Sequence, residues 1–307
     1  MKRVNIMKCV LIYNPNSGSA KKLTKRLDYI KERLCEKFDV LDIVPTRHEG
    51  HATEIAAAAC GKYDYLILCG GDGTFNEVIN GVAGKPNSPI LGYIPCGTVC
   101  DMAKNLKMSR NIKKSVNLIL NGDVVRHDVC KINDKHFIYV AAIGGYTAIS
   151  YGLKSASKKT LGKLAYFTHG IGLVFKVKNK PMHIKVTIGD EIYEGDYSYA
   201  FVANTTSIGG FRLNAGAKLN DGMVDLILIK KSFLNGMLKI LKMFTFGVVR
   251  LNDRNVKKFV IPECSIEFEE KRVWNLDGEE GIVGSAHFKV LKEDVRVIVA
   301  KEMEEWF

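Results

Sequence analysis

The sequence predicts an α/β protein of two domains, a three-layer α/β domain at the N-terminus and a mainly antiparallel β domain after it. The chain has 307 residues, which is enough for two hydrophobic cores. Strand and helix patterns alternate through residue 126, as in βαβ units, whereas strands with short turns and few helices follow. We therefore predict domains at 1–126 and 127–294, with the last strand, within 295–307, returning to the first domain.

The elements of the first domain follow from apolar runs and helical periodicity. Cys9–Tyr13 is a continuous apolar run, typical of a strand buried on both faces of a parallel sheet. Apolar residues at 23, 27, 30 and 34 then lie on one face of a helix. Further strands are expected at Val40–Val44, Tyr65–Cys69 and Ile90–Ile94, and further helices at Ala52–Ala59, from about Thr74, at Thr98–Leu106 and at Ile112–Leu120.

The second half is expected to consist of strands joined by short turns. One helix is expected at Phe233–Val249, where apolar and basic residues alternate. Its basic edge could lie on anionic lipid, although a solvated surface with a core-facing stripe explains the pattern equally well. The predicted strands are Phe137–Ile143, His183–Ile188, Tyr199–Asn204, Met223–Ile229, Lys257–Ile261, Ser265–Phe268, His287–Leu291 and Val295–Ala300, with another around Val273–Leu276.

Basic residues exceed acidic ones. There are 45 Lys and Arg against 33 Asp and Glu, a net charge of +12. The segments from Lys154 to Lys185 and from Lys230 to Arg250 contain no acid. Such an excess favours an anionic partner: nucleic acid, nucleotide or membrane surface. Nucleic acid is not expected, because the sequence shows neither a recognised binding module nor interleaved aromatics on a sheet face.

The cysteines and the N-terminus indicate a cytoplasmic protein. Eight cysteines are scattered without a CxxC pair, so we expect reduced thiols rather than disulfides or a zinc site. The apolar run Cys9–Tyr13 is too short for the core of a signal peptide. No window approaches the ~18 apolar residues of a membrane span.

Unusual loops follow the four strands of the first domain. In an open α/β sheet, ligands bind where strands end and helices begin, so all four loops are expected at one edge. In order, they are Asn14-Pro15-Asn16-Ser17-Gly18, Thr46-Arg47-His48-Glu49-Gly50-His51, Gly70-Gly71-Asp72-Gly73-Thr74 and Pro95-Cys96-Gly97-Thr98.

These residue types favour a phosphate ligand. Glycines allow close backbone approach, helix N-termini attract anions, and Thr74 and Thr98 add hydroxyls. Asp72 would repel a phosphate unless a cation lay between them, which indicates Mg²⁺, and Glu77 follows one turn later on the same helical face. The alternative is that these are turn formers and that Asp72 caps a helix. The pattern is neither a P-loop nor a standard dinucleotide fingerprint, whose third glycine is replaced by Asn76.

Five segments together resemble the diacylglycerol kinase catalytic domain, and specifically the bacterial soluble lipid kinase family. They are NPNSG, GGDGTFNEVING, PCGTVCD, SIGGFRLNAGAKLNDGMVDL and NLDGE, in the order of that family. The similarity spans nearly the whole chain. With the phosphate loops it implies an ATP-binding set of Asn14, Pro15, Asn16, Ser17, Gly18, Thr46, Gly70, Gly71, Asp72, Gly73, Thr74, Asn76, Glu77 and Thr98.

The resemblance also implies catalytic and metal-binding residues. Asp72 and Asp101 would hold the catalytic Mg²⁺ through water, while Asp277 and Glu279, from the second domain, would supply the base and a further metal contact. ATP would then lie between the domains. A structural magnesium site would be formed by Lys218, Asp221 and Met223, although Asn-Asp-Gly is also a typical hairpin turn. An acidic surface turn remains the alternative for Asp277-Gly278-Glu279.

Three features do not follow the family pattern or fall outside it. Cys96 stands where a small Gly or Ser is usual, and Cys100 where Asn commonly precedes the aspartate, which puts the detail of Asp101 in doubt. His48 and His51 have the spacing of metal ligands, but the sequence suggests no third ligand near them. We expect them to shape the Thr46 loop.

The function predicted is an ATP- and Mg²⁺-dependent lipid kinase, with diacylglycerol giving phosphatidic acid as the first expectation. Phosphatidylglycerol and sphingoid lipids remain open as acceptors, because a lipid pocket leaves no short motif. The alternatives are an NAD kinase and a non-catalytic nucleotide-binding regulator on the same fold. We expect a cytoplasmic protein that associates peripherally and transiently with an anionic membrane, and a homodimer by analogy with the family.

Overall fold

The computed structural model describes residues 6–15, 23, 25–97, 100–144, 181–205, 207–208, 211–212, 218–230, 256–301, 303 and 307. The predicted helix Phe233–Val249, most of the basic segment from Lys154, and the site residues Asn16, Ser17, Gly18 and Thr98 lie outside them. The chain divides into two compact units. The first comprises Met1–Val129, Gly216–Gly222 and Leu291–Phe307, and the second Cys130–Ala215 and Met223–Val290.

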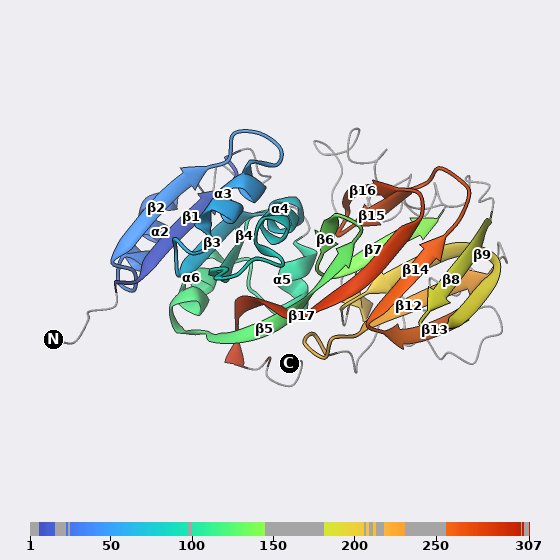
Figure 1. Ribbon diagram of the computed structural model, residues 1–307. Helices are drawn as coiled ribbons and strands as arrows, with labels where there is room; N and C mark the ends of the chain where they lie inside the picture. Colours follow the sequence, from blue (N-terminus) through green and yellow to red (C-terminus); the bar gives the residue numbers. More distant parts are fainter. Residues whose placement is uncertain are drawn as a thin grey trace. The chain divides into compact units, whose positions relative to one another are not determined.

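The first unit is built on a parallel sheet with the strand order β2-β1-β3-β4-β17 (Figure 1). Four of these strands match the predicted ones to within a residue at each end. The apolar run of β1 is buried along most of its length, as expected of a strand covered on both faces. The bounds are β1 Lys8–Tyr13, β2 Val40–Pro45, β3 Tyr65–Gly70, β4 Ile90–Pro95 and β17 Ala286–Val299.

Helices cover both faces of this sheet and complete three layers (Figure 1). On one face, α2 (Leu27–Leu34) and α6 (Ile112–Asn121) share a core with alternate residues of β1 and β3, including Cys9 and Ile67. On the other face, α3 (His51–Ala59) and α4 (Asp72–Val82) lie so close that a Cβ on Gly81 would be 2.6 Å from that of Ala56. The short α5 (Asp101–Asn105) follows the fourth loop.

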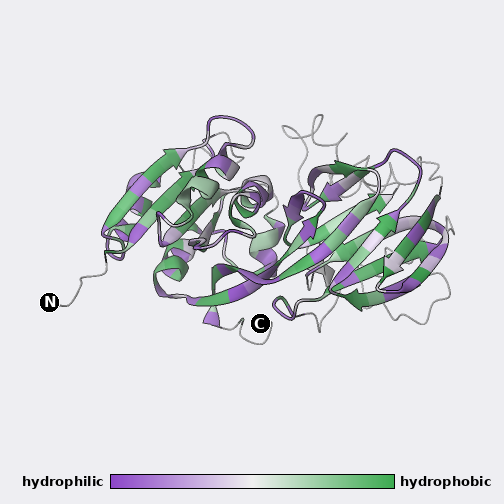
Figure 2. Ribbon diagram, in the orientation of Figure 1, coloured by the Kyte–Doolittle hydropathy of each residue, from purple (hydrophilic) through white to green (hydrophobic). Residues whose placement is uncertain are grey.

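The second unit is a largely antiparallel β structure whose strands follow the order β16-β15-β7-β9-β8-β14-β17. β9 is central, because it pairs with β8 along its first half and with β7 and β12 along its second. Apolar and polar residues alternate along many of these strands, whereas β1 and β3 are apolar over most of their length (Figure 2). The strand β5 (Asp123–Ile132) begins in the first unit and ends in the second. The bounds of the other strands are β6 Lys135–Phe137, β7 Val140–Gly144, β8 Met182–Ile188, β9 Glu191–Ala203, β10 Ser207–Ile208, β11 Phe211–Arg212, β12 Val224–Lys230, β13 Val256–Ile261, β14 Glu263–Glu267, β15 Val273–Leu276 and β16 Glu279–Val283.

Two predicted strand assignments were wrong. The expected strand Phe137–Ile143 is two strands, β6 and β7, because the backbone N–H groups between them bond to a carboxylate instead of a neighbouring strand. The two strands expected at His287–Leu291 and Val295–Ala300 are the single strand β17. Its polar middle looked like a turn, but Glu293, at φ +52°, is held within the strand by a hydrogen bond to Asp128.

Candidate active site

Three of the predicted loops are joined by backbone hydrogen bonds at the carboxyl ends of their strands. Thr46 N, after β2, donates to Tyr13 O at 2.9 Å. Asn14 N, after β1, donates to Cys69 O at 3.1 Å. The loops after β1, β2 and β3 therefore meet at one edge of the sheet, as the predicted parallel order requires.

The third and fourth loops touch backbone to backbone. Gly70 O accepts from Cys96 N (2.8 Å) and Gly97 N (3.1 Å), and also from the buried Tyr93 hydroxyl (3.3 Å). A Cβ added to Gly97 would lie 2.5 Å from the Cα of Gly71. Real Cβ atoms do not approach backbone so closely, so glycine at this point is required for the contact between the loops.

The N-terminus of α4 follows the third loop. The helix begins at Asp72, two residues before the predicted start, with Gly71 at its N-cap. No side chain in the described part of the chain caps it, so its first N–H groups keep the partial positive charge that attracts anions. Thr74 is buried and covers Gly70, where an added Cβ would lie 2.6 Å from the Thr74 Cβ. This end of the helix is therefore suited to a phosphate.

Asp72 lies in an environment that suits a cation. Its Oδ1 accepts a hydrogen bond from Met102 N at 3.2 Å, at the start of α5. Burial raises the pKa of Asp72, and the negative charge of Asp101 raises it further. Asp101 itself forms an ion pair with Lys104. A buried carboxylate beside a second acid is stabilised by a divalent cation, so the donor set fits Mg²⁺.

Two members of the predicted ATP-binding set have other contacts. One oxygen of Glu77 accepts from Ala52 N at 3.1 Å, and the Glu77 carbonyl accepts from the Thr53 hydroxyl at 2.9 Å. Asn76 is bonded through both its carbonyl and its side chain to the amide of Asn80. Glu77 therefore links α4 to the start of α3, a contact that the sequence did not suggest.

In the second unit, Asp277 and Gly278 form the turn between β15 and β16. Their φ values of +52° and +91° are those of a two-residue type I′ hairpin, for which Asp-Gly is a favoured pair. The Asp277 carboxylate accepts from the N–H groups of Ile138 (2.8 Å), Tyr139 (3.0 Å) and Val140 (3.0 Å). The side chain is 2% exposed. Asp277 thus holds the segment between β6 and β7 in place.

Glu279 differs from Asp277 in its surroundings. It is the first residue of β16 and pairs with Leu276 across the hairpin. It is half-buried, whereas Asp277 is buried. The turn places the two carboxylates of the Asp-Gly-Glu motif in different environments.

The residues predicted for a structural metal lie just before β12. Lys218, Asp221 and Met223 are all exposed in the described segment. Gly222 takes φ +82°, as a tight turn requires. The turn occurs where the sequence predicted it.

Asp128 organises this turn and was missed by the sequence analysis. Its carboxylate accepts from Gly222 N and Glu293 N, each at 2.7 Å, and its own N–H donates to Leu219 O at 2.8 Å. Burial raises the pKa of Asp128, and the charge of Asp221 adds to the shift. No local pattern in the sequence singled it out, because Asp128 follows Arg126 and His127 in a segment of mixed polar and apolar residues.

Comparison with known proteins bears directly on this arrangement. A family model described as the diacylglycerol kinase catalytic domain matches residues 8–132, and one described as the YegS C-terminal NAD kinase beta sandwich-like domain matches residues 139–299. A diacylglycerol kinase of Bacillus subtilis is 33% identical over 315 residues, covering 99% of each chain. The chain belongs to the diacylglycerol kinase family.

Other members of the diacylglycerol kinase family support the same assignment. A diacylglycerol kinase of Staphylococcus saprophyticus is 34% identical over 297 residues, covering 96% of each chain. A crystal structure of a diacylglycerol kinase from Bacillus anthracis superposes with a TM-score of 0.81 at 26% identity, over 98% of this chain and all of that one. The predicted family is confirmed, and so is the predicted fold of an α/β domain followed by a mainly antiparallel β domain, which the second family model describes as β sandwich-like. A kinase of this family implies ATP as its phosphate donor, and the lipid kinase interpretation is preferred over an NAD kinase.

The structure places both of the cysteines that depart from the diacylglycerol kinase pattern in buried positions. Cys100 takes φ +53°, a conformation that Asn adopts more readily than most residues. Cys96 accepts a hydrogen bond from Cys69, which lowers its pKa, and the charge of Arg110 lowers it further. Arg110 also donates to the carbonyl of Gly97.

In the part of the chain that the structure describes, no helix is long and apolar enough to cross a membrane.

Proposed function

We propose that the protein transfers the γ-phosphate of ATP to the hydroxyl of diacylglycerol, giving phosphatidic acid. One observation carries this proposal: backbone hydrogen bonds join the ends of four parallel strands at the edge where α4 begins, and no described side chain caps that helix, in a member of the diacylglycerol kinase family. The match to relatives named diacylglycerol kinase along nearly their whole length supports this acceptor over the phosphatidylglycerol and sphingoid alternatives.

The phosphates of ATP would bind against the loops after β1, β3 and β4. The N–H groups at the start of α4 would provide backbone donors, and Gly71 and Gly97 have no side chains of their own at the point where the two loops touch. Asp72 and Asp101 would hold Mg²⁺. The ion would supply positive charge that offsets the negative charge developing on the phosphate oxygens during transfer.

Glu279 is the better candidate for the base that accepts the proton of the lipid hydroxyl. Both oxygens of Asp277 accept backbone hydrogen bonds, which keep the carboxylate pointed at residues 138–140. Glu279 is half-buried at the start of a strand, where a carboxylate can still reach a substrate. We therefore assign Asp277 a positioning role and Glu279 the proton transfer.

Paired variants test this assignment. Glu279→Gln should lower kcat by about 10²- to 10⁴-fold with little change in the KM for ATP or in thermal stability, because only proton transfer is lost. Asp277→Asn should mainly lower the melting temperature, because the Asn side chain has one acceptor oxygen, whereas the carboxylate of Asp277 accepts three N–H bonds through two. A fully active Glu279→Gln enzyme would overturn the base assignment.

The acceptor is tested separately with radiolabelled ATP. Purified protein should phosphorylate diacylglycerol in mixed vesicles at least tenfold faster than phosphatidylglycerol, sphingosine or NAD. Differences in the contacts that an enzyme makes with competing substrates commonly give rate ratios of this size. Phosphorylation of NAD with no lipid product would refute the proposed function. Nucleotide binding without any product would identify a non-catalytic regulator.

We further propose that the protein associates transiently with anionic membranes and forms a homodimer. The net charge of +12 supports the first proposal, since basic surfaces are attracted to anionic lipid. Vesicles containing phosphatidylglycerol should sediment the protein, phosphatidylcholine vesicles should not, and added salt should release it. Sedimentation equilibrium tests the dimer, and a monomer at micromolar concentration would contradict it.

The turn at Lys218, Asp221 and Met223 is proposed as a second, structural Mg²⁺ site. The raised pKa of Asp128 beside Asp221 supports it, because a cation would relieve the repulsion between the two acids. Mg²⁺ should raise the melting temperature of the wild type, and Asp221→Asn should reduce that gain. An equal gain in the variant would count against the site.

A further inference from the structure

His48, His51 and Glu54 gather at the start of α3. Their potential ligand atoms all lie within 4.8 Å of one another. The sequence suggested that no third ligand lay near the two histidines, and the structure corrects this. The sequence predicts His51 in a loop, whereas it is the first residue of α3, so that Glu54 follows it by about one helical turn.

The local backbone brings the three side chains together. Gly50, at φ +81°, turns the chain so that His51 N donates to His48 O at 3.3 Å. The two imidazole rings then lie 4.8 Å apart between centroids, tilted by 32°. Glu54 follows His51 by three residues on α3, and residues at that spacing share one face of a helix.

We propose that His48, His51 and Glu54 bind a divalent transition-metal ion of the Zn²⁺ type, with water in the remaining position. Two imidazoles and one carboxylate are a ligand set that such ions favour. With metal–ligand bonds of about 2.1 Å, ligand atoms of a tetrahedral site are about 3.4 Å apart, so the separations of up to 4.8 Å between the potential ligand atoms must shorten by up to about 1.4 Å. His48 and Glu54 are exposed, and rotation of their side chains can supply that movement.

The imidazole rings of His48 and His51 differ in their hydrogen bonds, because one donates and the other accepts. His48 Nδ1 lies 2.9 Å from the carbonyl oxygen of Glu49, so it carries the proton and leaves the Nε2 lone pair for a metal. This is the usual arrangement of a metal-binding histidine, whose second nitrogen donates to an oxygen. His51 Nδ1 accepts from Arg47 N at 3.1 Å. A metal bound at Nδ1 of His51 would displace this hydrogen bond. A metal bound at Nε2 would also break it, because the proton of the neutral ring would then lie on Nδ1, which could no longer accept from Arg47 N.

Breaking the bond from Arg47 has a local consequence. Arg47 follows Thr46, whose N–H is bonded to Tyr13 O. Metal binding would therefore release one of the contacts that hold this loop. The N-terminus of α3 disfavours a cation, and the charge of Glu54 in the first helical turn offsets that effect.

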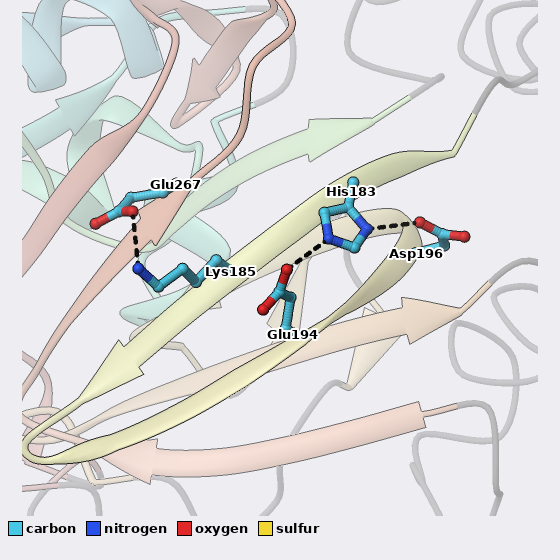
Figure 3. A network of polar contacts seen from close by, with 5 residues as sticks. All are labelled: His183, Lys185, Glu194, Asp196 and Glu267. Carbon is cyan, nitrogen blue, oxygen red and sulfur yellow. Dashed lines mark hydrogen bonds and ion pairs between the residues drawn. The ribbon is translucent and has the colours of Figure 1, made fainter.

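His183 provides a matched contrast. It is exposed and flanked by two carboxylates, with Nε2 2.8 Å from Glu194 and Nδ1 3.0 Å from Asp196 (Figure 3). The two nitrogens point to opposite sides of the ring, so the acids cannot meet one ion with it. In the described part of the chain, the three side chains at the start of α3 are the group that converges.

Metal titration of the full chain tests the proposal. Isothermal titration with Zn²⁺ should detect one site of micromolar affinity, weakened about tenfold or more by His48→Gln and by Glu54→Gln, since even outer-shell losses cost this much. His183→Asn should bind as the wild type does. Both substitutions at the site are on exposed side chains, and unchanged melting temperatures will confirm folding.

Cysteines are the competing ligands, because Cys35 is exposed and Cys60 half-buried. Titration with Co²⁺ separates them, since thiolate ligands give near-ultraviolet charge-transfer bands and a site of imidazole and carboxylate does not. Visible bands without charge transfer, lost in His48→Gln, are expected. The proposal would be overturned by thiolate charge-transfer bands or by the absence of a saturable site. It would also be overturned if His48→Gln and Glu54→Gln bound the metal as tightly as the wild type.

Discussion

Replacing Gly97 with alanine tests whether the contact between the third and fourth loops is what positions the phosphates. The added Cβ would lie 2.5 Å from the Cα of Gly71. Non-bonded carbons sit about 3.5–4.0 Å apart, so the loops must separate by about 1 Å. Overpacking of this kind costs about 1–3 kcal/mol. A displacement of about 1 Å at a positioning group lowers the rate about 10²-fold.

The assay is kcat/KM for ATP with diacylglycerol in mixed vesicles, together with a thermal melt. Gly92→Ala is the control, because its added Cβ is also 2.5 Å from a neighbour, but that neighbour is the end of the Ile67 side chain. Ile67 can rotate away, so this variant should lose some stability and keep its kcat/KM to within about threefold. If Gly97→Ala is as active as Gly92→Ala, the loop contact does not position the phosphates.

Three further predictions concern charge. Burial lowers the pKa of His127 from 6.5 to about 4, so the histidine of the unfolded chain takes up its proton first as pH falls through this range. The free energy of unfolding should therefore drop by about 3 kcal/mol between pH 6.5 and 4, and His127→Gln should remove this part of the pH dependence measured by urea unfolding. Hydrogen bonds to Glu194, and secondly to Asp196, raise the pKa of His183. The stability that these contacts contribute is present below the ordinary histidine pKa and is lost as pH rises through the raised pKa of His183. In NMR titrations, Glu194→Gln should lower the pKa of His183 more than Asp196→Asn does. Asp72→Asn should raise the Mg²⁺ concentration required for half-maximal activity, and an unchanged requirement would exclude it as a metal residue.

The elements that could be predicted from the sequence are those determined by local patterns. β1 and β3 are apolar runs buried on both faces, and α6 begins at Ile112, directly after Asn111, whose side chain caps it. The break between β6 and β7 could not be read locally, because it depends on Asp277, more than a hundred residues away. The continuity of β17 likewise depends on Asp128, which holds the N–H of Glu293 in the middle of a polar stretch.

The candidate site divides in the same way. The glycines, the acid and the hydroxyl after β3 indicate a phosphate and a cation by their chemistry, wherever the rest of the chain lies. The sequence could not separate the roles of Asp277 and Glu279, because both are carboxylates in one short motif. Three backbone N–H groups from residues 138–140 make that distinction.

By itself, the sequence determined the order of the domains, the family and the type of ligand, because these rest on residue types at short spacings. The tertiary structure decided which of those residues meet. It joined the loops after four strands, directed Glu77 to α3, made Asp128 the centre of the turn before β12, and brought Glu54 to two histidines. Each of these contacts depends on the path of the folded chain or on where a helix begins, and neither is apparent from the spacing of residues alone.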